Sequence, residues 1–254
     1  MKNMYKLKEV CFRYTDRWVL EDISLDVMDG EMLGVIGPNG SGKSSLLKLL
    51  SRMNAPQKGE QFLRDVDMTL MDQSDFAKTV AFVPQESSFS FPFTVGEIVL
   101  MGRDPHLKGR LFESPHDVDV AMEVMSWMDI AGLEGRPITD ISGGERQRTI
   151  IARALAQKPD VLILDEPTTS LDISHQVDIC NILTRLNIEK GLTIIISSHD
   201  LNLASKYCHR LMLMSKGRIY KVGTPSEVIT EENIRDVYGC PVIVDTILWQ
   251  ECRG

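Results

Sequence analysis

One stretch of this sequence organises the rest: Gly37-Pro38-Asn39-Gly40-Ser41-Gly42-Lys43-Ser44. It matches the phosphate-binding pattern G-x-x-x-x-G-K-[ST] at every fixed position. Its glycines let backbone amides approach an anion closely, because no Cβ obstructs them. The ammonium group of Lys43 suits the β- and γ-phosphates of a nucleotide, and the hydroxyl of Ser44 suits Mg²⁺. This phosphate loop (residues 37–44) therefore predicts a site for a nucleoside triphosphate.

The flanking residues place the phosphate loop between a strand and a helix. The apolar run Met32–Ile36 is typical of a buried strand, and residues 45–50 have a helical pattern. The helix N-terminus, where Ser45 lies, would then point free amides at bound phosphates. The alternative, a glycine-rich turn that matches by chance, is disfavoured by this order of strand, loop and helix.

Composition limits the class of protein. With 254 residues, the chain is long enough for one large domain with an insertion, and 43% apolar residues argue against disorder. A formal net charge of −8 gives no overall basic footprint for nucleic acid, and although this leaves room for a local basic patch, we expect no nucleic-acid partner. The five scattered cysteines form no C-x-x-C pair, which fits a reducing cytosol.

The sequence also shows no sign of a membrane anchor. No window approaches the roughly 18 consecutive apolar residues of a membrane span. The N-terminal residues lead into an alternating strand pattern rather than a signal peptide. We therefore expect any membrane role to be peripheral and to depend on a partner.

Strand and helix patterns alternate around the phosphate loop. Residues 4–13 and 19–27 predict an N-terminal antiparallel β subdomain. The apolar runs Val80–Val83, Val161–Leu164 and Thr193–Ser197 predict buried strands. Strands that alternate with helices imply an α/β fold with a parallel sheet, whose ligand groups lie at the carboxyl ends of the strands.

The middle of the chain has a helical character. Thr94 and Glu97 match a capping box, and Ser114 precedes a proline at a first helical position. We predict a helical subdomain, residues 87–141, inserted into a nucleotide-binding core of residues 1–86 and 142–222. A helical tail, residues 223–254, completes a single domain, 1–254.

Polar residues follow three of the predicted core strands. Asp165 suits a water-mediated contact with Mg²⁺, while Glu166 points elsewhere and can orient or deprotonate a water molecule. A solvated acidic turn is the alternative. His199 either hydrogen-bonds a γ-phosphate or is an exposed loop histidine. Gln85 is either solvated or reaches a metal or water.

A second glycine turn (residues 141–148) reads Ile141-Ser142-Gly143-Gly144-Glu145-Arg146-Gln147-Arg148. Ser142 and Glu145 predict a capping box for a helix that runs to about Gln157. Two glycines in a first turn are costly for a helix, unless that turn must lie against a phosphate. The chain already has one phosphate loop, so this turn must serve a nucleotide elsewhere, most simply that of another copy. Reciprocity implies a twofold dimer with two nucleotides at its interface.

Together these motifs resemble an ABC-type ATPase subunit with a P-loop NTPase core. The resemblance spans nearly the whole chain and departs at Ile141, where leucine is commoner. The matching segments, in the family's order and spacing, are Gly37 to Ser44, Gln85, Ser142 to Gln147, Val161 to Glu166, Ser170-Leu171-Asp172 and His199.

The resemblance implies roles that the residues alone do not settle. Considered by itself, Tyr14 is best interpreted as a half-buried strand aromatic, but the family implies that it stacks on adenine. It implies that Gln85 binds Mg²⁺ and relays contact with a membrane partner. It also implies that Glu166 is the catalytic carboxylate and that Asp172 bridges the two subunits.

Other segments are similar to the importer ATPases for iron–siderophore, haem and cobalamin. They are Thr94-Val95-Gly96-Glu97, Met101-Gly102-Arg103-Asp104-Pro105-His106, Gly223-Thr224-Pro225-Ser226-Glu227 and Tyr238-Gly239. The alternative is that other importers share them. This resemblance implies a transmembrane permease as partner, a substrate-binding protein indirectly, and a place at the cytoplasmic face of the cell membrane.

Our principal hypothesis is an ATP-hydrolysing importer subunit, in which ATP closes two copies together and hydrolysis reopens them. An importer of another substrate is a close alternative. A soluble ABC ATPase that acts on nucleic acid or ribosomes usually carries a long coiled coil, a zinc module or tandem cassettes, and the sequence has none. A phosphotransferase would leave the second glycine turn unexplained.

Overall fold

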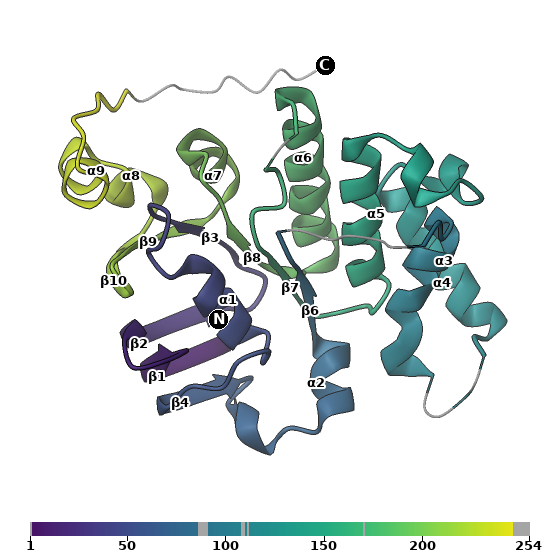
Figure 1. The fold of residues 1–254 in the computed structure, drawn as a ribbon, viewed down its shortest axis with the longest axis horizontal. Coiled ribbons are helices and arrows are strands. Elements are labelled where there is room, and N and C mark those ends of the chain that lie inside the picture. Colours follow the sequence, from purple (N-terminus) through teal and green to yellow (C-terminus); the bar gives the residue numbers. More distant parts are fainter. Residues whose placement is uncertain (1, 86–90, 108–109, 111, 170, 246–254) are drawn as a thin grey trace.

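The computed structural model describes residues 2–85, 91–107, 110, 112–169 and 171–245 (Figure 1). Three predicted features lie wholly or partly outside these residues: the start of the helical subdomain at Ser87, Ser170 of the family motif, and the end of the tail.

The main sheet holds the phosphate loop. Within the described residues it has six strands in the order β10-β9-β3-β8-β7-β6, and all but β10 run parallel. The predicted parallel sheet is therefore confirmed. Its strands are β3 (Met32–Ile36), β6 (Val80–Val83), β7 (Val161–Leu164), β8 (Thr193–Ser197), β9 (Arg210–Ser215) and β10 (Arg218–Gly223).

A second, antiparallel sheet covers one face of the main sheet. Its order is β2-β1-β4-β5, and Leu7 of β1 pairs with Leu25 of β2. The N-terminal antiparallel subdomain is therefore confirmed. Its strands are β1 (Asn3–Arg13), β2 (Trp18–Met28), β4 (Lys58–Leu63) and β5 (Val66–Asp67).

Helix α1 (Lys43–Leu50) fills the space between the two sheets. Leu46, Leu47, Leu49 and Leu50 are all fully buried, so this helix buries one broad apolar face. It begins at Lys43, two residues before the predicted helix. Its position fixes the phosphate loop at the carboxyl end of β3.

The opposite face of the main sheet carries α5 (Gly143–Leu155), α6 (Ile173–Lys190) and α7 (Leu201–Tyr207) (Figure 1). Helix α7 escapes sequence prediction because it is short and buries only Ala204. Helix α2 (Gln73–Thr79) buries only Phe76 and escapes for the same reason.

The middle of the chain is helical, as predicted, and packs beyond α5 (Figure 1). Its elements are α3 (Val95–Leu100), the 3₁₀ helix η2 (Met101–His106), α4 (Pro115–Trp127) and two 3₁₀ turns, η3 (Ala131–Leu133) and η4 (Ile138–Asp140). Capping boxes begin α3 and α4 at Thr94 and Ser114.

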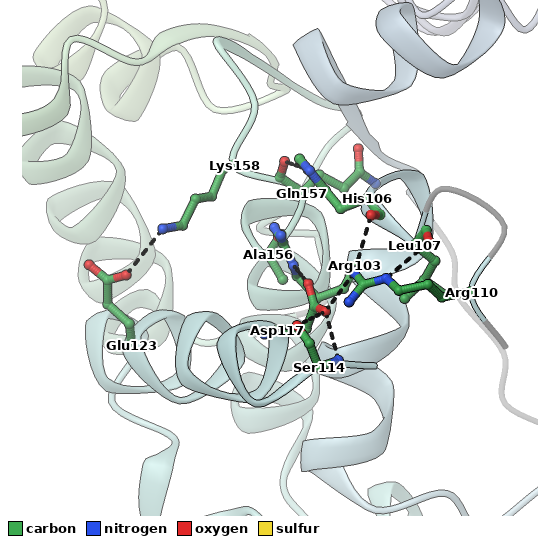
Figure 2. A network of polar contacts seen from close by, with 10 residues as sticks. All are labelled: Arg103, His106, Leu107, Arg110, Ser114, Asp117, Glu123, Ala156, Gln157 and Lys158. Atoms are coloured by element: carbon green, nitrogen blue, oxygen red, sulfur yellow. Dashed lines mark hydrogen bonds and ion pairs between the residues drawn. The ribbon is translucent and has the colours of Figure 1, made fainter. Parts of the chain in front are cut away.

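A buried ion-pair network ties this helical region to the end of α5 (Figure 2). Arg103 donates from Nε to Asp117 Oδ1 at 3.0 Å and from Nη1 to the carbonyl oxygen of Ala156 at 2.6 Å. Both charged side chains are almost fully buried, at 4% and 2% exposed. Hydrogen bonds from Ser114, together with Arg103, hold the pKa of the Asp117 carboxyl well below its usual range.

The tail forms two short helices, α8 (Pro225–Val228) and α9 (Glu231–Tyr238). Gly239 ends α9 with a φ of 71°, a left-handed conformation that glycine adopts without strain. None of the helices in the described part of the chain combines the length and apolar content that a membrane crossing needs.

Candidate nucleotide-binding site

The phosphate loop has a backbone that only glycine tolerates at two points. Gly37 and Gly42 have φ values of 148° and 105°. A Cβ on Gly37 would lie 2.4 Å from the carbonyl oxygen of Met214, and one on Gly42 would lie 2.7 Å from Leu20 Cδ2. The loop is thus pressed against its own chain on its inner side, while its tip at Asn39 and Gly40 is exposed.

Lys43 folds back over the loop. Its side chain is buried, and Nζ donates to the carbonyl oxygens of Gly37 at 2.8 Å and Pro38 at 3.3 Å. Burial lowers the pKa of Lys43, whereas the charges of Glu166 and Asp165 raise it. Lys43 therefore lies within electrostatic reach of both predicted carboxylates.

Ser197 fixes the two carboxylates that follow β7. Its Oγ donates to Asp165 Oδ1 at 2.7 Å and accepts from the backbone N–H of Glu166 at 2.8 Å. Sequence reasoning missed this fully buried residue. The available signal was a hydroxyl at the last position of an apolar strand, next to the strand that carries the carboxylates.

The Glu166 carboxylate contacts two of the other predicted site residues. Its Oε2 accepts from Gln85 Nε2 at 2.8 Å, and its Oε1 lies 2.5 Å from His199 Nε2. Thr169, which sequence reasoning missed, donates its hydroxyl at 3.3 Å. The backbone of Glu166 is left-handed, with a φ of 50°, which costs about 1 to 3 kcal/mol for a residue with a side chain. This turn directs Glu166 away from Asp165.

Tyr14 is placed differently from the interpretation based on its local sequence. It lies one residue beyond β1 and is 58% exposed, so it is not a half-buried strand aromatic. Phe12 packs edge-on against the Tyr14 ring, with 4.7 Å between the ring centroids. The Tyr14 hydroxyl lies 3.5 Å from Ser45 Oγ. The exposed ring therefore stands beside the start of α1, where stacking on a base remains a prediction.

The second glycine turn caps α5 as predicted. Glu145 Oε2 accepts from the backbone N–H of Ser142 at 2.8 Å, and the backbone N–H of Glu145 donates to Ser142 Oγ at 3.3 Å. The bond from the Ser142 backbone lowers the pKa of Glu145. Ser142 and Gly143 are exposed.

One of the two costly glycines has a local explanation that the sequence did not reveal. A Cβ on Gly144 would lie 2.4 Å from the ring of His175, whereas one on Gly143 would meet only Leu171 Cδ2 at 3.9 Å. Gly144 is thus required by packing within the chain. The inference from two glycines to a phosphate now applies to Gly143 alone.

Asp172 lies beside this turn and begins α6. Its Oδ1 accepts from the backbone N–H of His175 at 2.9 Å and from Ser174 Oγ at 2.9 Å. These bonds, with the His175 ring at 2.7 Å, lower its pKa to about 2. Because the His175 ring also packs on Gly144, Asp172 and the glycine turn form one exposed surface.

The phosphate loop and the glycine turn belong to opposite faces of the sheet. The leucines of α1 pack with Val35 and Ile163 of the sheet, whereas the apolar residues of α5 pack with Ile36 and Leu164. Alternate residues of β3 and β7 thus point to the two helices. Within the described residues, no hydrogen bond joins the glycine turn to the phosphate loop.

Known proteins match the chain along most of its length. The family model described as ABC transporter matches residues 20–169. The petrobactin import ATP-binding protein FpuC of Bacillus anthracis is 37% identical over 94% of this chain and 88% of that protein. The hemin import ATP-binding protein HmuV of Pseudomonas fluorescens is 39% identical over 95% and 94%. The cobalamin import ATP-binding protein BtuD of Halobacterium salinarum is 38% identical over 90% of this chain, which spans 57% of that protein.

Solved structures that resemble this chain also belong to ABC transporters. A metal-chelate type ABC transporter in an inward-facing conformation has a TM-score of 0.84 and 30% identity, over 94% of this chain and 90% of that one. A dimeric bacterial ABC transporter cassette has a TM-score of 0.74 and 27% identity, over 87% and 99%. These matches confirm the resemblance and the P-loop NTPase fold that the motifs predicted.

Proposed function

This chain belongs to the ABC transporter family and is an ATPase subunit, and from this premise we propose that it powers the import of a metal chelate. The proposed cargo class comprises iron–siderophore complexes, haem and cobalamin, because the similar importer subunits named above serve petrobactin, hemin and cobalamin. Import of another substrate is the alternative.

The contacts that converge on the Glu166 carboxylate are the main support for the proposed ATP hydrolysis. The left-handed turn, the Gln85 amide and the His199 ring hold this buried carboxylate at the strand ends beside Lys43. In this role Glu166 orients the attacking water and accepts its proton, and His199 contacts the γ-phosphate. The loop amides and Lys43 bind the β- and γ-phosphates, and Tyr14 stacks on adenine.

The donor set of the site suits Mg²⁺, which prefers oxygen ligands. We assign Ser44, Gln85 and Asp165 as the residues that hold it. The Gln85 Nε2 atom donates to Glu166, so its carbonyl oxygen is the atom left for the cation. When bound, Mg²⁺ would neutralise phosphate charge while the γ-phosphoryl group is transferred to water and ADP leaves.

A second copy of the chain completes the site in this proposal. The partner's Ser142, Gly143, Gly144 and Glu145 turn contacts the nucleotide, and Asp172 contacts the partner. Support comes from the exposure of Ser142 and Gly143, the position of the turn across the sheet from its own loop, and the dimeric cassette. Closure of the dimer would couple the binding of ATP to a movement of the two copies toward each other.

Importer ATPases work with permease subunits, and we place this one at the cytoplasmic face of the membrane beside such a permease. Gln85 joins Glu166 to the chain that leads into the helical region, so a permease contact there would reach the catalytic carboxylate. A substrate-binding protein takes part indirectly.

Uptake measurements test the cargo. A deletion strain carrying the wild-type chain should accumulate radiolabelled haem, cobalamin or a ferric siderophore, and the same strain carrying Glu166→Gln should not. Wild-type uptake of none of these would favour another cargo. Recovery of the protein with ribosomes or DNA, and never with a permease, would favour the soluble alternative.

A further inference from the structure

The exposed Tyr14 side chain is held at its hydroxyl end by a residue from a distant part of the chain. Asn54 Nδ2 donates to the Tyr14 hydroxyl oxygen at 3.3 Å, and the same oxygen lies 3.5 Å from Ser45 Oγ. A phenol hydroxyl can accept one hydrogen bond and donate another, so its hydrogen is left for Ser45. Asn54 is half-buried, whereas Tyr14 is 58% exposed. The amide thus fixes an aromatic side chain that lies mostly in solvent.

The backbone of Asn54 is itself anchored on helix α1. Arg52 follows the end of this helix with a left-handed φ of 58°, and the chain reverses there. The backbone N–H groups of Met53 and Asn54 then both donate to the carbonyl oxygen of Lys48, at 2.9 and 3.2 Å. Lys48 lies about one helical turn after Ser45. The reversal therefore carries the Asn54 side chain back toward the start of α1, where the nucleotide would bind.

A second side chain of the same connection, residues 51–57, holds the backbone beside Tyr14. Gln57 Oε1 accepts from the backbone N–H of Arg13 at 2.8 Å. The contacts to Arg13 and Tyr14 lie beyond Cys11, the last residue of β1 that pairs with β4. They are therefore additional to the pairing of these two strands. Together they fix both the Tyr14 ring and the backbone that carries it.

We propose that Asn54 is a positioning residue, which holds the Tyr14 ring ready for the base of the nucleotide. This inference rests on the proposed stacking of Tyr14 on adenine. A side chain that is already ordered loses less conformational freedom on binding, so its order favours affinity. Because the amide bonds the hydroxyl rather than the ring, it leaves the ring available for stacking.

Asn54→Ala tests the proposal with two ligands: ATP, and inorganic tripolyphosphate, which has the phosphates but no base. We expect the Kd for ATP to rise about two- to fivefold, the worth of one long hydrogen bond, and the Kd for tripolyphosphate to stay unchanged. Titration calorimetry with Mg²⁺ measures both constants. In steady-state hydrolysis the KM for ATP should rise in parallel while kcat changes little, because the base is remote from the reacting phosphate.

Equal losses for ATP and tripolyphosphate would overturn the proposal, because they would show that Asn54 only supports the phosphate loop. The Tyr14→Phe background gives a second test, since it removes the hydroxyl that Asn54 bonds. Adding Asn54→Ala to Tyr14→Phe should weaken ATP binding no further. A further loss as large as that in the wild-type background would also overturn the proposal.

Asn3→Ala is the matched control. Asn3 Nδ2 donates to Asp26 Oδ1 at the same 3.3 Å, but at the other end of β1. This variant should leave the Kd for ATP unchanged. Tyr14→Ala separates the two levels of the proposal. If it binds ATP like the wild type, the proposed stacking itself fails; if it binds ATP weakly while Asn54→Ala binds ATP like the wild type, only the positioning role fails.

Discussion

The two glycine turns of this chain differ in what completes them. The phosphate loop is enclosed by its own chain, with Lys43 buried and Gly37 pressed on Met214. The second turn satisfies its own cap, and then presents Ser142 and Gly143 to solvent. The phosphate loop packs against its own chain on its inner side, whereas the second turn makes no hydrogen bond to the phosphate loop within the described residues. This difference is the basis of our proposal that the second turn of one copy completes the nucleotide site of another.

Glu166→Gln tests the catalytic residue beside the phosphate loop, and we expect it to have the largest effect on ATP turnover. Removing the carboxylate should lower ATP turnover about 10² to 10⁴-fold while ATP still binds, because Lys43 and the loop are intact. Steady-state hydrolysis and equilibrium binding measure the two effects. Glu60→Gln, at an exposed pair with Lys8, is the control and should behave like the wild type. Undiminished hydrolysis by Glu166→Gln would refute its role.

Asp117→Asn tests the anchor of the helix that carries the second turn. It would leave Arg103 buried without its counter-ion, and we expect a loss of about 3 to 5 kcal/mol in the free energy of unfolding. Denaturant unfolding measures this loss, while the folded fraction should bind ATP normally. A change below 1 kcal/mol would show that the network does not secure α5.

The same carboxyl gives a pH dependence. Its pKa is depressed in the folded protein, so its contribution to stability is present above the unfolded pKa of about 4 and is lost as pH falls through the folded value. Unfolding measured from pH 7 down to pH 3 should therefore show a steeper decline for the wild type than for Asp117→Asn. Parallel curves would contradict the assignment.

Ser142→Arg tests the turn side of the comparison. The bulky cation should block the partner's approach and lower turnover about a hundredfold, while each chain still binds ATP. Ser126→Arg, an exposed serine on α4, is the matched control. If Ser142→Arg lost ATP binding as well, the turn would belong to its own loop rather than to a partner's.

The smallest predicted effect distinguishes the two glycines of the second turn. Gly144→Ala should cost about 1 to 3 kcal/mol because its Cβ would collide with His175. Gly143→Ala meets no close atom and should be neutral or slightly stabilising, since alanine favours helices. Chemical denaturation of both variants checks this, and equal losses would rule out the packing explanation for Gly144.

Local patterns predicted both turns, the parallel sheet and the carboxylates, because glycine spacing, caps and apolar runs are properties of short segments. These local patterns could not predict contacts between segments that are far apart in the sequence. Ser197 acts through Asp165 and Glu166, and His175 explains Gly144; both contacts exist only after the chain folds. The interpretation of Tyr14 as a half-buried strand aromatic was wrong for the same reason, since the exposure of its ring depends on where β1 ends.

The mass of the Glu166→Gln variant with saturating Mg²⁺ and ATP tests the shared site most directly. Light scattering should give twice the mass of one chain with ATP, and that dimer should vanish when Ser142→Arg is added to the same chain. A variant that binds ATP yet stays at the mass of one chain, beside a wild-type monomer that hydrolyses ATP at full rate, would contradict the account.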